Sequence, residues 1–129
     1  MIQTISNEAV FTAHLYDNGI IDIRWNEKLL FIDIEHLLEV KKAVEQLGGG
    51  KRMRLFFFTH DFIQTTPQAQ ELAATEKYTE FTLAVAVLVN SMALRLAMNF
   101  FMRLHRPFVP SKGFDSREKA HEWLLSVPD

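Results

Sequence analysis

The feature that most constrains the fold is an uninterrupted apolar run, Leu83–Val89, which leads directly into a helical pattern. The run is too short to cross a membrane but suits a β-strand that is buried on both faces. Asn90 and Ser91 interrupt it, and the pattern of Met92–Leu104 then predicts a helix with Ser91 as its N-cap. A buried strand that leads into a helix is typical of the parallel sheet of an α/β protein.

Length and composition are those of one ordinary globular domain, which we expect to span residues 1–129. The residues are 48% hydrophobic and 23% charged, with a mean hydropathy of −0.01, so disordered and integral membrane proteins are excluded. The chain has no cysteine, which excludes disulfides, thiolate catalysis and cysteine-ligated metals. Since no signal peptide or membrane span is recognisable, we expect a cytoplasmic protein.

An alternating pattern predicts a β-hairpin over residues 10–26. A three-residue loop at 17–19 pairs Leu15 with Ile21 and places the apolar residues of both strands on one face. A two-residue loop would place them on opposite faces, so we expect the longer loop, with Gly19 in the left-handed conformation. The apolar residues of the two strands are Phe11, Ala13, Leu15, Ile21, Ile23 and Trp25.

Helices and strands are predicted to alternate over residues 33–127. Asp33 is the expected N-cap of a first helix that the glycines at 48–50 end, and the apolar run 55–58 predicts a second central strand. A second helix is expected to run to about Tyr78, capped by Thr65 or by Thr66. A short edge strand at 107–110 and a last helix after residue 116 complete an α/β fold with a mixed sheet of four to five strands and about four helices.

Several stretches of the sequence resemble a group of small bacterial STAS-like proteins, whose activity is largely uncharacterised. The resemblance covers about residues 10–126 and implies the single-domain STAS-like fold of the sporulation anti-sigma-factor antagonist. The similar stretches are YDNGIIDIRW, GGGK after the first helix, AVAVLVNS, NFFMRLHRPFVPSKGF and EKAHEWL.

The resemblance also implies a place for a phosphorylation switch. STAS antagonists bind a partner protein and are switched at a Ser or Thr in an Asp-Ser-x-x-Gly pattern that opens the helix after the central strand. The matching region is FIQTTPQAQ, where Thr65 or Thr66 is the candidate phospho-switch; Gln64 replaces the acidic residue and the glycine is missing. Helix N-capping, worth about 1 kcal/mol, explains the same two threonines without a switch.

Other chemistries lack the residues that they need. His60, Asp61 and Ser91 are expected at the carboxyl edge of the sheet, but no G-x-S-x-G motif surrounds the serine and the adjacent His60 and Asp61 side chains point apart. The histidines share no metal-ligand spacing. The triple glycine follows a helix rather than a strand, so it does not form a phosphate cradle. We therefore expect no enzyme, no metal site and no cofactor.

The predicted third helix has more apolar surface than one buried face requires. No acidic residue occurs in 81–114, which carries four basic ones. Either neighbouring segments cover the apolar excess, or the helix is a partner or ligand surface with Met and Phe as anchors and Arg at the rim. The residues of this candidate surface are Met92, Arg95, Met98, Asn99, Phe100, Phe101, Arg103, Arg106 and Lys112.

The leading interpretation is a non-catalytic regulatory or interaction module with an unidentified protein partner. The apolar excess of the third helix favours a homodimer, and the modest basic charge argues against nucleic acid as a partner. The alternative is a protein that binds a small apolar or anionic, lipid-like ligand, because lipid carriers of the CRAL-TRIO type are related in fold to STAS domains. The two interpretations differ in whether Met98, Phe100 and Phe101 surround a cavity or form a convex patch.

Overall fold

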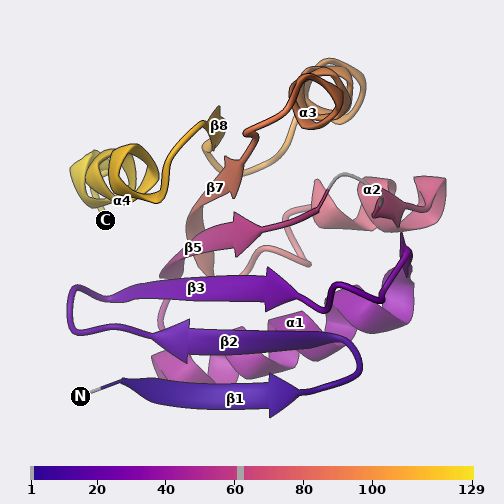
Figure 1. The fold of residues 1–129 in the computed structure, drawn as a ribbon. Helices are drawn as coiled ribbons and strands as arrows, with labels where there is room; N and C mark the ends of the chain where they lie inside the picture. Colours follow the sequence, from indigo (N-terminus) through magenta and orange to yellow (C-terminus); the bar gives the residue numbers. More distant parts are fainter. Residues whose placement is uncertain (1, 61–62) are drawn as a thin grey trace.

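The computed structural model describes residues 2–60 and 63–129, and its centre is a six-stranded mixed sheet (Figure 1). The strands are β1 (Gln3–Asn7), β2 (Phe11–Leu15), β3 (Ile20–Trp25), β5 (Met53–Phe58), β7 (Thr82–Leu88) and β8 (Ser111–Phe114), in that spatial order. β1, β2 and β3 are antiparallel neighbours, whereas β5, β7 and β8 follow parallel to β3. A separate parallel pair joins β4 (Phe31–Ile32) to β6 (Gln64–Thr65).

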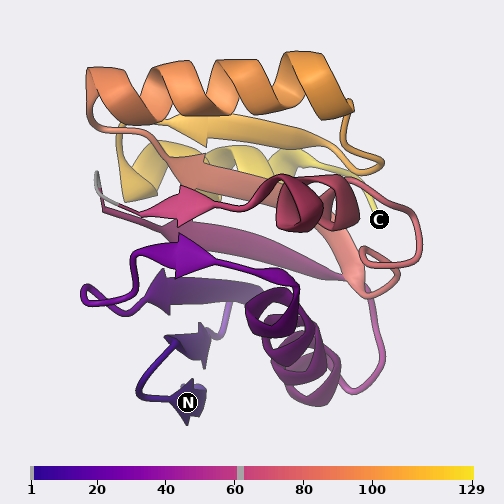
Figure 2. The same ribbon diagram turned by 90° about the vertical axis from the view of Figure 1, so that its right-hand side faces the viewer.

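Helices cover both faces of the sheet. On one face lie α1 (Ile34–Gly48), α2 (Pro67–Ala73) and α3 (Met92–His105), and on the other lies α4 (Arg117–Ser126) (Figures 1 and 2). The larger core fills the space between α1, α2 and strands β2, β3 and β5. The smaller core lies between α4 and strands β3, β5 and β7. Within the described residues, no helix has the length and apolar character that crossing a membrane requires.

The predicted hairpin is confirmed in its register. Leu15 pairs with Ile21, Ala13 with Ile23 and Phe11 with Trp25, and Gly19 has a φ of 85°. The predicted central strands are also confirmed, since β5 and β7 are parallel neighbours.

The predicted helix starts are confirmed as well. Asp33, Ser91 and Ser116 each accept a backbone N–H at the start of their helix, and Thr66 does so for α2 with Pro67 in the first turn. The predicted end of α2 near Tyr78 is wrong, because the helix stops at Ala73. The Thr75 hydroxyl donates to Leu72 O and accepts from Tyr78 N, which turns the chain out of the helix.

Two predictions about strands are corrected. The main sheet has six strands rather than four to five, because the polar N-terminal segment pairs with β2 through its backbone. The edge strand is Ser111–Phe114 rather than 107–110. Proline lacks the N–H that a ladder needs, and Pro110 contributes only its carbonyl, which accepts from Val85 N.

Candidate functional site

A cavity of about 470 Å³ lies between the sheet and the helices α1, α2 and α3. Its floor is formed by apolar side chains of β3, β5 and β7, and its walls include Val40 of α1 and Met98 of α3. This volume falls within the ~300–1,000 Å³ typical of small-molecule sites. The floor residues are Trp25, Leu55, Phe57, Val85 and Val87.

The floor shows that protein side chains do not fill this space. Phe57, Val85 and Val87 are only half-buried, although β5 and β7 have hydrogen-bonded neighbours on both sides. On the opposite face of the same two strands, Phe56 and Ala86 are 0% exposed. The apolar floor on the α3 side is therefore left partly uncovered.

Helix α3 forms one wall of the cavity, which remains partly open to solvent. Met98 and Phe101 line the cavity, whereas Phe100 and Met92 face away and are 62% and 69% exposed. The candidate surface predicted from the sequence is therefore divided between the two sides of one helix. Leu94 is the one buried residue of α3, with 9% of its surface exposed.

Few polar contacts hold α3 in place. The Arg95 Nε donates to Val89 O at 3.3 Å, and His105 Nε2 lies 3.2 Å from Gln70 Oε1 of α2. Gly113 lets β8 lie close to Val89, because a Cβ there would lie 2.8 Å from a methyl group of Val89. The contact between α3 and the rest of the fold is narrow.

One end of the cavity is polar. It lies where β5 ends, which is where open α/β sheets commonly bind ligands. Gln70 donates from Nε2 to Thr65 O at 3.0 Å, so its amide is held at this end. Side chains with hydrogen-bonding groups here belong to Thr59, Gln64, Thr65 and Gln70.

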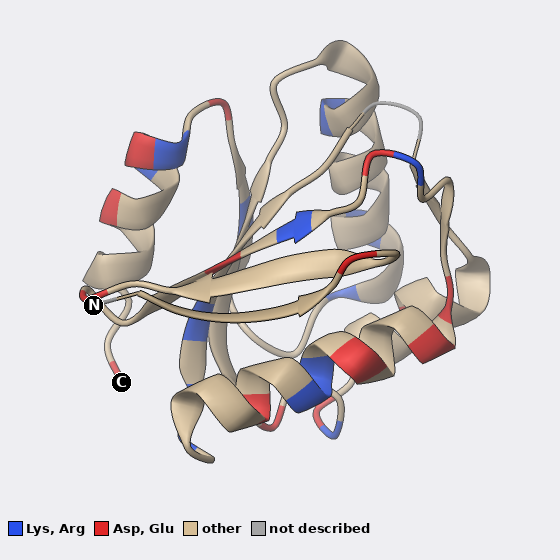
Figure 3. Cartoon of the chain, turned by 60° about the horizontal axis from the view of Figure 1, so that its bottom comes forward, with Lys and Arg blue, Asp and Glu red and all other residues tan. Residues whose placement is uncertain are grey.

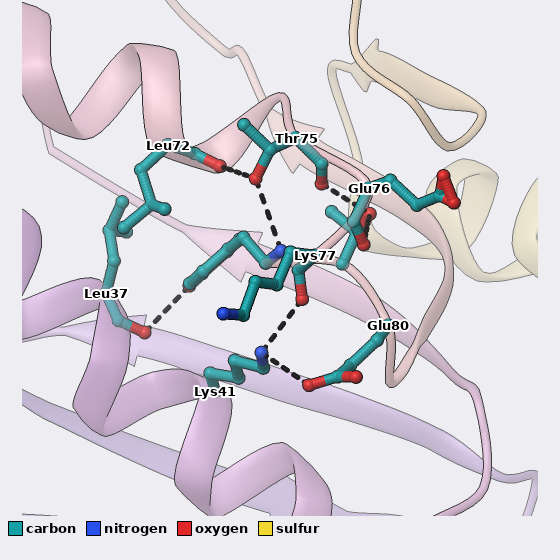
Figure 4. A network of polar contacts seen from close by, with 9 residues as sticks. Leu37, Lys41, Leu72, Thr75, Glu76, Lys77 and Glu80 are labelled. Carbon is teal, nitrogen blue, oxygen red and sulfur yellow. Dashed lines mark hydrogen bonds and ion pairs between the residues drawn. The ribbon is translucent and has the colours of Figure 1, made fainter.

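The opposite wall carries a charge that is already paired. Lys41 is the only charged residue among the described residues that line the cavity. Its Nζ lies 2.7 Å from Glu80 Oε1 and donates to Lys77 O at 2.8 Å (Figure 4). The cavity therefore offers an arriving anion no unpaired cation.

The same network fixes residues 74–81 against α1 (Figure 4). The Tyr78 hydroxyl donates to Leu37 O at 2.8 Å, and the Thr79 hydroxyl donates to Thr75 O at 2.8 Å. Burial raises the pKa of Tyr78 well above its ordinary value, because the interior disfavours the charged phenolate. This wall of the cavity is held more firmly than the α3 wall.

The two candidate switch residues occupy different positions. Thr66 accepts from Ala69 N at 3.2 Å and donates to Asp33 Oδ1 at 3.0 Å, so its hydroxyl is used on both sides. A phosphate on Thr66 would stand beside the Asp33 carboxylate, which repels it. Thr65 lies in β6 and lines the cavity.

A smaller hollow lies on the outer flank of α3. Arg95 and Asn99 meet Asp115 there, and Lys119 lowers the pKa of Asp115, chiefly through its hydrogen bond and then through its charge. Arg103 and Arg106 are not part of this hollow. Lys112 is separated from it, since its Nζ lies over the Phe114 ring, which packs against Trp123 of α4 on the other face of the sheet.

Most of the chain matches one protein family. The model of a family described as a domain of unknown function, DUF7793, matches residues 14–127. The chain belongs to this family. The crystal structure of a protein with unknown function from Arthrobacter sp. FB24 is 21% identical, covers 87% of this chain and 96% of its own, and has a TM-score of 0.29. A comparison with curated proteins finds no match.

In this DUF7793 member, two of the three residues that were considered for hydrolytic catalysis, His60 and Ser91, have structural contacts. His60 Nε2 lies 3.0 Å from Leu29 O, and Ser91 caps α3. Asp61 lies outside the described residues. Across residues 2–60 and 63–129, no three His, Asp or Glu side chains are grouped as metal ligands.

Sequence reasoning missed a buried polar cluster under α4. Asp22 accepts from His121 Nε2 at 2.7 Å and from Arg117 Nε at 2.8 Å. Asn18 fixes the imidazole tautomer, because its Oδ1 accepts from Ile20 N and its Nδ2 therefore donates to His121 Nδ1. The proton of the neutral ring then lies on Nε2. Asp22 and His121 are 3% and 7% exposed, and the sheet separates them from the cavity, so the cluster anchors α4.

Proposed function

We propose that this protein binds a small, uncharged and largely apolar molecule in the cavity between the sheet and α3. The supporting observation is the half-buried apolar floor on two central strands. The cavity is partly open to solvent, so part of its apolar floor is left in contact with water. A bound apolar molecule would remove this floor from water, which is favourable by about 25 cal/mol per Å² of apolar surface.

The lining narrows the chemistry of the ligand. The sequence left an apolar and an anionic ligand open, and the pairing of Lys41 with Glu80 favours the uncharged one. Burying an unpaired carboxylate among apolar side chains is strongly unfavourable. The polar end near Thr59 and Gln70 suits one hydroxyl or carbonyl group of the ligand.

A non-catalytic regulatory module with a STAS-like fold is the second candidate function. The exposed apolar side chains on the outside of α3 favour it, because they offer a contact surface that the cavity does not use. The two candidates use opposite sides of the same helix. Variants on the two sides of α3 therefore separate them.

Ligand binding is tested first with native mass spectrometry of gently purified protein, where the proposal predicts a mass above that of the bare 15.0 kDa chain. Titrations then compare a neutral apolar probe, N-phenyl-1-naphthylamine, with the anion dodecanoate. The neutral probe should bind more tightly. Val87→Phe, which fills the floor of the cavity, should weaken probe binding by about tenfold or more.

The matched control is Leu88→Phe, because Leu88 is the next residue of the same strand and packs toward α4. It should leave probe affinity unchanged. Equal probe affinity in the unmodified protein and both variants would rule out this cavity as the binding site. Tighter binding of dodecanoate would replace the uncharged ligand class by the anionic one.

A further inference from the structure

The outer side of α3 carries two parallel rows of side chains. Residues four apart on a helix lie above one another, so one row is apolar and the adjacent row is polar. The apolar row consists of Met92, Leu96, Phe100 and Leu104, and the polar row of Arg95, Asn99 and Arg103.

The apolar row is fully open to solvent. Its four side chains are 69%, 61%, 62% and 60% exposed, and Phe108, just beyond the helix, is 60% exposed as well. Single exposed apolar residues are normal on a protein surface, but a continuous row indicates a contact site. Figure 2 shows α3 running along the outer edge of the molecule, with no other element beyond it.

The charged residues that α3 itself places beside this row are all basic, while Asp115 lies next to Arg95 in the hollow on this flank of the helix. The helix carries Arg95 and Arg103 without any acidic residue, and Arg106 follows at its end. In Figure 3, α1 shows both red and blue bands, whereas α3 shows blue bands alone. A partner that covers this side of α3 must therefore supply both an apolar region for the apolar row and negative charge for the arginines.

We propose that α3 docks the protein on a membrane surface that carries anionic headgroups. The helix has 14 residues, about 21 Å in length, and its apolar row can enter the headgroup and acyl boundary while the arginines contact the phosphates. A second copy of the chain fits less well, because an antiparallel two-fold pairing of two α3 helices would bring their arginine rows together, and in a parallel pairing α3 supplies no acidic residue to meet them. The proposal does not depend on whether the cavity is occupied.

Vesicle co-sedimentation tests this proposal with the full chain. Vesicles of equal parts phosphatidylcholine and phosphatidylglycerol should retain the protein, and phosphatidylcholine alone should retain much less. Raising the salt concentration should weaken the binding, because it screens exposed charges. Phe100→Asp should lower the partition coefficient by about tenfold or more, and Arg103→Gln by about fivefold.

The control variant is Leu125→Asp on α4, where the side chain is 50% exposed on the opposite side of the sheet. It should leave vesicle binding unchanged, and circular dichroism should show the same fold in all variants. Failure to bind anionic vesicles, or equal binding to neutral ones, would overturn the proposal. Light scattering provides the other decisive outcome: a dimer that Phe100→Asp converts to a monomer, without vesicle binding, would assign the apolar row to a second copy.

Discussion

The two faces of the central sheet are covered in different ways. On the α4 face, Ala84, Ala86 and Ala120 are 0% exposed, and these small side chains let the helix lie close to the strands. On the α3 face, β7 presents the larger side chains of Val85 and Val87, which stay half-buried. Along residues 84–87 of β7, the side with the larger apolar residues is therefore the less completely covered one.

The difference lies in how each helix is attached. Helix α4 buries Leu124 completely and is fastened by the hydrogen bonds of Asp22 to His121 and Arg117. Helix α3 has Leu94 as its one buried side chain. The buried contacts of α4 hold it close to its face of the sheet, whereas the fewer contacts of α3 leave a cavity between the helix and the sheet.

The largest expected effect comes from removing the hydrogen bonds of Asp22 that hold α4 against the sheet. Asp22→Ala should lower the free energy of unfolding by about 3 kcal/mol, because it leaves the buried His121 and part of Arg117 without their partner. Urea unfolding followed by circular dichroism measures the change. Asp115→Ala, which removes an exposed carboxylate paired with Lys119, should lower the free energy of unfolding far less than Asp22→Ala does. A small effect of Asp22→Ala would show that apolar packing alone holds α4.

A matched pair of leucines compares the packing of the two helices directly. Leu124→Ala should cost about 3 kcal/mol, because it opens a new void in a filled core. Leu94→Ala should cost less than about 2 kcal/mol, since Leu94 already borders the cavity. The same urea experiment measures both. Equal losses would mean that the α3 side is as well packed as the α4 side.

The smallest expected effect concerns pH and the wall formed by residues 74–81. Below pH 10 the phenol of Tyr78 is protonated in both the folded and the unfolded chain. Above pH 10 the unfolded phenol loses its proton, whereas burial keeps the folded one protonated. Stability should therefore fall by up to about 1.4 kcal/mol per pH unit.

Tyr78→Phe provides the control for this pH dependence, because all other groups titrate equally in both proteins. The difference in unfolding free energy between the unmodified protein and Tyr78→Phe should shrink between pH 9 and pH 11. A difference that stays constant over this range would show that the Tyr78 hydroxyl titrates normally in the folded protein.

Local patterns in the sequence were sufficient for much of the fold. The alternation around Gly19 predicted the hairpin register, since one buried face allows a single pairing. Side chains at Asp33, Ser91 and Ser116 predicted the helix starts, because capping acts within one turn. β1 was missed because it is an edge strand with a mostly exposed, polar sequence, whose pairing comes from the backbone.

The candidate site was only partly predictable. Met98 and Phe101 were identified as candidate residues, but a residue that lines a cavity and one that fills a core have the same apolar character. Asp22 was expected on a polar face because it alternates with Ile21 and Ile23. Its partner His121 lies 99 positions away, and no local pattern links residues so far apart.

The C-terminal end of α3 has a strained backbone conformation. Arg106, the only described non-glycine residue with a positive φ, closes the helix at φ 46°. This conformation costs roughly 1–2 kcal/mol, and detachment of α3 would relieve it. The amide hydrogens of α3 should therefore exchange with solvent through a local opening, while those of α4 exchange only when the whole domain unfolds. Such a pattern of exchange would divide the molecule into two cooperative units of unequal stability within a single fold.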